Sequence, residues 1–179
     1  GLPLPGTSLR IADENNSALP AGEIGGIQVK GDNVFSGNWR MPEKTREEFT
    51  ADGYFKTGDV GKVDEQGYVS IVGRSKDLVI SGGYNVYPKE IEELIDAMPG
   101  VVESAVIGVP HPDFGEAVTA VVVKRKDANE LTDASIIQAL KKEIANYKVP
   151  KKVFFVDDLP RNAMGKVQKN VLRESYGNK

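Results

Sequence analysis

Short apolar runs, bounded by glycine, asparagine, aspartate and proline, recur through the first 75 residues. Three of them predict strands of about five residues: Ser8–Ala12, Gly26–Lys30 and Tyr68–Val72. Closely spaced short strands are typical of an antiparallel sheet or a partial barrel. Between them, Pro42–Phe49 predicts a short helix, because proline occupies its first turn and acidic side chains follow early.

From residue 88 onward the apolar positions repeat with the period of a helix. Pro88 opens a run whose apolar members stand at i, i+3, i+4 and i+7, namely Ile91, Leu94, Ile95 and Met98. Pro99-Gly100 ends this run. A second helix is predicted to begin after Thr132 and to end near Tyr147. Its expected buried face comprises Ile136, Ile137, Leu140 and Ile144.

Apolar runs of strand length lie around the second helix. Ser104–Val109 and Val118–Lys124 predict two strands, with Pro110–Glu116 as the loop between them. Val153–Val156 predicts another strand, and Leu159–Gly165 predicts the loop that follows it. Strands and helices therefore interleave in this half of the chain.

The change of pattern divides the chain into two predicted parts. Residues 1–75 are strand-rich, and residues 76–179 form a small α+β domain that ends in a short helix carrying Val167, Val171 and Leu172. The predicted fold class is α+β. Internal repeats and low-complexity tracts are absent from the sequence.

Composition excludes several classes of protein. Of 179 residues, 40% are hydrophobic and 27% charged, which is typical of a globular chain and not of a disordered one. A net charge of −3 with dispersed Lys and Arg gives no nucleic-acid surface. The absence of Cys rules out disulfides and favours a reducing compartment, so we expect the cytoplasm. We find neither a signal peptide nor a membrane span.

Three segments carry candidate chemistry, although each also has an ordinary interpretation. Thr57-Gly58-Asp59 could be a common turn, and Gly82-Gly83 a hairpin turn. Arg74 and Lys76 could be solvated surface charges. Lys166, behind a glycine, could be one more exposed lysine. No cluster has metal-ligand spacing, and we expect Asp157-Asp158 to end a strand instead of binding Mg²⁺.

Order and spacing together resemble the adenylate-forming superfamily, which includes acyl-CoA synthetases, luciferases and peptide-synthetase adenylation domains. The matching segments cover nearly the whole chain: Gly1–Gly6, Gly22–Gly25, Asn33–Trp39, Thr57–Asp59, Gly73–Asp77 and Gly165-Lys166. Within the superfamily the sequence is most similar to malonyl-CoA synthetases. The segments that carry this similarity are Trp39–Thr45, Asp96–Glu103 and Pro160–Lys166.

This resemblance implies an AMP-forming acid–thiol ligase. Family members activate a carboxylic acid with Mg-ATP, release pyrophosphate, and pass the acyl group from the adenylate to CoA with loss of AMP. The chain resembles their C-terminal part, with residues 1–75 from the β-barrel of the large AMP-binding domain and 76–179 as the small mobile domain. Malonate or a related acid is the implied substrate, with medium- or long-chain fatty acids as the alternative.

The resemblance also assigns roles to single residues. Asp59 matches the acceptor for the ribose hydroxyls, and Arg74 matches the arginine that reaches the ribose or phosphate. Ile71 either flanks the nucleoside or belongs to the core. Lys166 matches the lysine that stabilises charge during adenylation, and Lys76 stands at the family's hinge.

The CoA-binding loop of the family matches the segment that contains Ser81, Gly82, Gly83 and Tyr84. Its glycines let the backbone approach the pantetheine arm closely. The single histidine, His111, lies in a loop with family counterparts, and for it we favour a structural or solvent role over contact with CoA.

Parts of the family pattern are not among these 179 residues. They are the loop that cradles the β- and γ-phosphates, the magnesium-binding glutamate and the adenine-binding segment, so ATP and Mg²⁺ are expected to bind mainly elsewhere. The chain alone is expected to be inactive, and exposed apolar surface on residues 1–75 is expected to favour dimerisation. Two alternatives remain, an adenylation domain that loads a carrier protein and a non-catalytic interaction module of the same fold.

Overall fold

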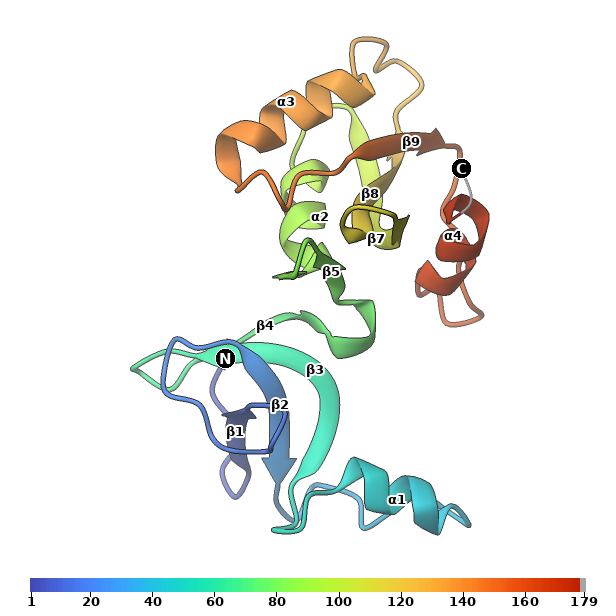
Figure 1. The fold of residues 1–179 in the computed structure, drawn as a ribbon. Coiled ribbons are helices and arrows are strands. Elements are labelled where there is room, and N and C mark those ends of the chain that lie inside the picture. The colour runs from blue at the N-terminus through green and yellow to red at the C-terminus, as the bar shows by residue number, and fades with distance from the viewer. Residues whose placement is uncertain (178–179) are drawn as a thin grey trace. The chain divides into compact units, whose positions relative to one another are not determined.

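The computed structural model describes residues 1–177 of the chain, and these residues divide into two compact units after Lys76 (Figure 1). The division follows Lys76, one residue after the boundary expected from the sequence. Each unit has its own sheet, and each is described by itself.

The first unit is an antiparallel meander of four strands in chain order: β1 (Ser8–Ala12), β2 (Gly25–Lys30), β3 (Phe55–Val63) and β4 (Val69–Arg74). Helix α1 (Pro42–Glu48) joins β2 to β3 and lies beside the start of β3. There the rings of Phe35, Phe49 and Phe55 pack with centroids 4.9–5.6 Å apart. The sequence predicted β1, β2, β4 and α1, but it missed β3.

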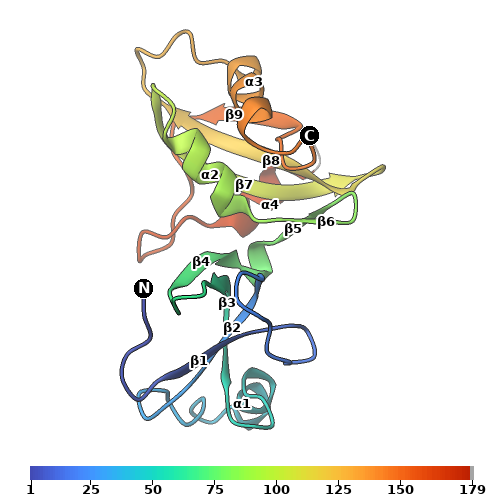
Figure 2. The same cartoon turned by 90° about the vertical axis from the view of Figure 1, so that its left-hand side faces the viewer.

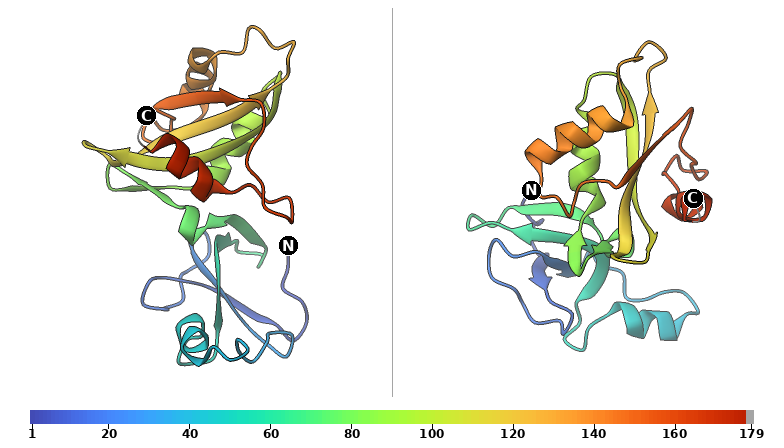
Figure 3. Two further views of the ribbon diagram at one scale, coloured as in Figure 1. Left: turned by 90° about the vertical axis from the view of Figure 1, so that its right-hand side faces the viewer. Right: turned by 45° about the horizontal axis from the view of Figure 1, so that its top comes forward.

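The second unit is a mixed sheet of five strands. Its order is β6 (Tyr84–Val86), β5 (Val79–Ser81), β8 (Gly115–Lys124) and β7 (Val101–His111), and β9 (Lys152–Val156) pairs in parallel with β8. Helices α2 (Pro88–Asp96) and α3 (Asp133–Glu143) lie on one face, and α4 (Lys169–Tyr176) lies on the other (Figures 2 and 3). The predicted α+β class is confirmed.

Strand alternation sends successive side chains of β7 and β8 into two different cores. The core beneath α2 and α3 contains Val106, Val118, Ala120 and Val122 together with Ile91, Ile95, Ile136 and Leu140. The core beneath α4 contains Ala105, Ile107, Val109, Val121 and Val123 together with Leu159 and Leu172. Because both faces of the sheet are covered, β7 is buried without interruption over 105–109 and β8 over 117–123.

Three predicted boundaries were wrong, each for a local reason. Helix α3 ends at Glu143 and not near Tyr147, because Ile144 adopts an extended conformation with φ −132° and ψ 160°. The loop expected at Pro110–Glu116 shrinks to a turn at 112–114, since β7 and β8 pair as far as His111 and Gly115. The last helix begins at Lys169, after Val167.

Candidate nucleotide and acyl-transfer site

In the first unit, Asp59 and Arg74 face each other across β3 and β4. They are register partners, and Arg74 Nε lies 3.0 Å from Asp59 Oδ1. Both side chains remain accessible, 27% exposed for Asp59 and 52% for Arg74. The turn alternative for Thr57-Gly58-Asp59 is wrong, because all three residues belong to β3.

Hydroxyl side chains fix the main chain around Asp59. The Oγ1 of Thr57 donates to the Ile27 carbonyl at 2.9 Å and accepts the Asp59 amide at 3.1 Å. The hydroxyl of Ser75 donates to the Gly58 carbonyl at 3.1 Å. On β4, Ile71 is 58% exposed and therefore lies outside the core, which removes one of its two sequence-based interpretations.

Lys76 occupies the middle of a single 3₁₀ turn, η1 (Ser75–Asp77), at the division between the units. On one side, Ser75 is bonded to Gly58 within the first unit. On the other side, Asp77 Oδ1 accepts Arg173 Nη2 at 3.1 Å within the second unit. Each neighbour of Lys76 is thus anchored in its own unit, while Lys76 itself is exposed.

Gly82 and Gly83 form the two-residue turn of the β5–β6 hairpin, which confirms the hairpin interpretation. Ser81 pairs with Tyr84, and both glycines have positive φ, 58° and 82°, as a tight primed turn requires. Ser81 is buried, whereas Tyr84 is 60% exposed and stacks on Tyr147 with centroids 4.7 Å apart.

Two contacts attach this hairpin to the main sheet. The Gly82 amide donates to the Phe114 carbonyl at 2.9 Å, and the Ile80 amide donates to Glu116 Oε2 at 2.8 Å.

His111 is the last residue of β7 and makes a contact within the adjoining turn, where its Nδ1 accepts the Asp113 amide at 3.2 Å. This local contact agrees with the structural role that we favoured for the histidine.

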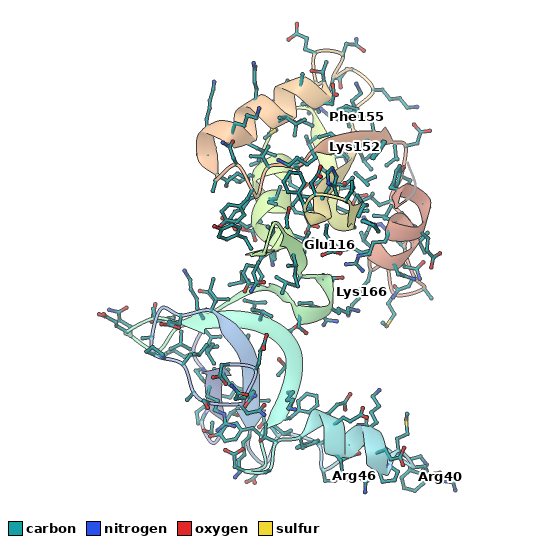
Figure 4. All side chains as sticks on the ribbon, viewed as in Figure 1. Arg40, Arg46, Glu116, Lys152, Phe155 and Lys166 are labelled. Carbon is teal, nitrogen blue, oxygen red and sulfur yellow. The ribbon has the colours of Figure 1, made fainter. Side chains whose placement is uncertain are left out.

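Lys166 lies on the loop between β9 and α4 (Figure 4). The side-chain oxygen of Asn162 accepts the amides of Met164 and Lys166, both at 3.0 Å, and the Asn162 amide donates to the Lys166 carbonyl at 2.9 Å. Gly165 has φ 77°, a conformation that favours glycine. Among residues 1–177, nothing pairs with the exposed ammonium of Lys166.

Sequence reasoning missed four residues that shape these segments: Asn162, Arg161, Glu103 and Glu116. The spacing of Asn162 and Gly165 is a turn signal that could have identified the asparagine. Arg161 and Glu103 are 58 positions apart, so no local pattern connects them. In the described part of the chain, no group of three or more His, Cys, Asp or Glu could hold a metal ion, and no helix is long and apolar enough to cross a membrane.

Comparison with known proteins points to the same family as the resemblance found in the sequence motifs. Residues 90–166 match the family described as the AMP-binding enzyme C-terminal domain. A 3-[(3aS,4S,7aS)-7a-methyl-1,5-dioxo-octahydro-1H-inden-4-yl]propanoyl:CoA ligase of Rhodococcus jostii is 47% identical over 97% of this chain and 32% of its own length. Long-chain-fatty-acid–CoA ligase FadD13 of Mycobacterium tuberculosis is 47% identical over 95% of this chain and 33% of its length. The chain thus spans about a third of the length of these curated relatives.

Solved structures extend the match. MatB from Rhodopseudomonas palustris with bound ATP is 65% identical, with a TM-score of 0.94 over 99% of this chain and 35% of that chain. MatB solved without ligand is 66% identical over the same shares but has a TM-score of 0.72. The expected resemblance is confirmed: residues 90–166 match the AMP-binding enzyme C-terminal domain, and nearly the whole chain is similar to CoA ligases and to MatB.

Proposed function

We propose that the protein containing this chain is an AMP-forming acid–CoA ligase. It would join a carboxylic acid to AMP and then transfer the acyl group to the thiol of CoA. The observation that carries the proposal is Lys166, an unpaired, exposed ammonium on a loop whose main chain is held by hydrogen bonds. The relatives reported above are CoA ligases, and their similarity to this chain supports the formation of an acyl-CoA thioester as the reaction.

Asp59 and Arg74 would hold the nucleoside. The ion pair with Arg74 uses Oδ1 of Asp59, which leaves Oδ2 as an acceptor for ribose hydroxyls. Arg74 is half exposed, so its guanidinium can turn a further N–H toward a ribose or phosphate oxygen. Ile71, on the same strand as Arg74, offers an exposed apolar side chain to the nucleoside.

Lys166 would act in the adenylation step. When the substrate carboxylate attacks the α-phosphorus, negative charge grows on the phosphoryl oxygens, and an ammonium placed there stabilises the transition state more than the ground state. Loss of one such donor typically costs roughly 10²–10³-fold in rate. The described residues contain no ligand set that fits Mg²⁺, so we derive no step through the metal from this chain.

Lys76 would be the hinge between the two half-reactions, with Ser81, Gly82, Gly83 and Tyr84 meeting CoA in the second. The anchors on Ser75 and Asp77 support this role, because they leave the φ and ψ of Lys76 to absorb a rotation. The two MatB structures also support it. At nearly equal identity their TM-scores to this chain are 0.94 and 0.72, so that relative adopts more than one backbone arrangement.

For the acid we propose malonate or a similarly small carboxylate. The segments that resemble malonyl-CoA synthetases, Trp39–Thr45 and Pro160–Lys166, support this choice. The similarity to FadD13, a long-chain-fatty-acid–CoA ligase, supports long-chain fatty acids as the second candidate substrate. A carrier protein remains the alternative acceptor of the acyl group. A cytoplasmic location agrees with the absence of Cys.

The test is ATP–pyrophosphate exchange by the full-length protein with malonate, fatty acids and aryl acids, followed by CoA or a phosphopantetheinylated carrier as acceptor. We expect exchange with malonate and acyl transfer to CoA. Lys166→Ala should lower exchange roughly 10²–10³-fold and leave thioester formation from preformed adenylate largely intact. Absence of exchange with every acid would favour the non-catalytic module.

The 179 residues alone are proposed to be inactive. Leu2, Leu4, Trp39 and Met41 are 50–85% exposed on the first unit, which supports association of isolated chains. Sedimentation of the isolated chain at several concentrations tests for a dimer.

A further inference from the structure

The loop that presents Lys166 depends on hydrogen bonds for its shape. A single bridge between Arg161 and Val167 closes the loop at its base. At Gly165, a Cβ atom would meet nothing within 4 Å, so no packing surrounds the residue before the lysine. With its positive φ and no side chain, Gly165 is the point about which the loop could pivot.

Arg161 connects this pivot to the sheet. Its Nη1 donates to the Gly165 carbonyl at 2.7 Å, and its Nη2 donates to Glu103 Oε2 on β7. The Gly165 carbonyl belongs to the peptide that also contains the Lys166 nitrogen. A guanidinium that holds this carbonyl therefore fixes the plane of that peptide, and with it the direction in which the Lys166 side chain leaves the main chain.

The arginine is itself held firmly. The side chain of Glu103 is 26% exposed and that of Arg161 is 41% exposed, so the ion pair is partly withdrawn from water. A guanidinium is a planar fork, and one donor on Glu103 sets the direction of the other. Glu103 lies on β7, whose neighbouring positions 105, 106 and 107 are buried in the two cores. The pair thus transfers the rigidity of the sheet to the loop.

We propose that Arg161 is a positioning residue for Lys166 and that Glu103 acts through Arg161. The proposal rests on the function proposed above for Lys166. Each Nη atom of Arg161 donates to an acceptor within the protein, one on the loop and one on the sheet, and this geometry suits an arginine that orients the loop. Since a displacement of about 1 Å can cost about 10²-fold in rate, loss of this contact should affect the adenylation step in particular.

The experiment uses the full-length protein and measures two half-reactions, ATP–pyrophosphate exchange and thioester formation from synthetic acyl-adenylate and CoA. Arg161→Met should lower kcat for exchange roughly 10–100-fold, with KM for ATP changed less than about twofold. Thioester formation should stay within about twofold of wild type. Arg161→Lys, which can keep one of the two contacts, should recover part of the loss. Arg125→Met is the matched control, because among the described residues the Arg125 side chain is ion-paired only with exposed Asp127.

Epistasis separates positioning from other roles. In the Lys166→Ala background, Arg161→Met should cause no further loss, and in the Arg161→Met background, Glu103→Gln should cause none. Equal loss in both half-reactions, or the same cost of Arg161→Met with and without Lys166, overturns the proposal. If Lys166→Ala itself leaves exchange unchanged, the function proposed for Lys166 fails. If Lys166→Ala removes exchange and Arg161→Met does not, only the positioning role fails.

Discussion

The two units hold their candidate site residues by different forces. In the described residues of Gly1–Lys76, four hydrophobic residues are buried, Ile11, Ala12, Ile27 and Val60, whereas nineteen are buried in the second unit. Asp59 and Arg74 therefore lie on a sheet with a thin core and are held by hydroxyls and an ion pair. The Gly82–Gly83 and Lys166 turns, by contrast, extend from a sheet that is covered on both faces.

This difference indicates which part of the protein can keep its geometry alone. Burial of apolar surface is the main favourable term in folding, and ion pairs at the surface contribute little. The turns of the second unit should therefore remain in place when the unit is separated. The ribose-binding pair should depend on whatever else supports the first unit.

The largest expected effect comes from separating the units. Asp77–Lys179 expressed alone should unfold in urea as one cooperative transition, because it contains both core clusters. Gly1–Lys76 alone should show no cooperative transition, because its core is too small to offset the chain entropy. Circular dichroism in urea tests both, and a cooperative Gly1–Lys76 would contradict the comparison.

Truncation of single core side chains tests the same difference between the units and should give the next largest effect. Ile107→Ala should destabilise the second unit by about 2–5 kcal/mol, since Ile107 is fully buried beneath α4. Ile27→Ala in the first unit should fall at or below the low end of that range, because few buried neighbours surround it. Amide exchange in the intact chain can follow each unit separately. Equal destabilisation by Ile27→Ala and Ile107→Ala would contradict the difference in core size between the two units.

Acidification should change the folding stability of the two units in opposite directions, through Asp52 in the first and Asp96 in the second. Arg10 bonds both carboxylate oxygens of Asp52, and this holds the Asp52 pKa at about 2, below the usual 3.8. The stabilisation from Asp52 is therefore full above pH 3.8 and lost as the pH falls through about 2. Burial raises the pKa of Asp96, so its ionised form costs stability, and protonation relieves that cost on acidification.

NMR titration of the two carboxyl groups measures both pKa values directly. Asp52→Asn should remove the acid-dependent loss in the first unit, and Asp96→Asn should remove the gain in the second. Shifts of both pKa values in one direction would contradict this assignment.

The smallest effect is expected at the anchor beside Lys76. Asp77 and Arg173 are 20% and 31% exposed, and their coupling in a double-mutant cycle should be about 1 kcal/mol or less. The exposed pair of Arg125 and Asp127 is the control, with coupling near zero. A coupling at Asp77–Arg173 no larger than the control would show that this contact does not anchor the turn.

Sequence patterns predicted the elements that bury a regular face. Helix α2 begins at the predicted Pro88 because its apolar spacing and its first-turn proline agree. Helix α3 begins after Thr132 as predicted, and the structure shows that Thr132 caps it through a reciprocal bond with Ser135. Strand β3 was missed because its sequence does not alternate apolar and polar residues: only Phe55, Val60 and Val63 of its nine residues have large apolar side chains. Strands β5 and β6 have three residues each, too few to show a period.

The candidate site divides in the same way. Asp59, Arg74, Gly83 and Lys166 could be named because the family resemblance depends on residue type and order. Glu103, Arg161 and Glu116 could not, because their roles arise from contacts between distant parts of the chain, such as the one between Ile80 and Glu116. The assigned roles of the named residues remain predictions that the half-reaction assays address.

The alternation of β7 and β8 between two cores limits how this domain can change length. One residue inserted into either strand would turn every following side chain to the opposite face and exchange the layers beneath α3 and α4. Single insertions and deletions should therefore be tolerated at the 112–114 turn and rejected within the strands. A library of one-residue insertions across 101–124 should show that asymmetry as a sharp step at each end of the turn.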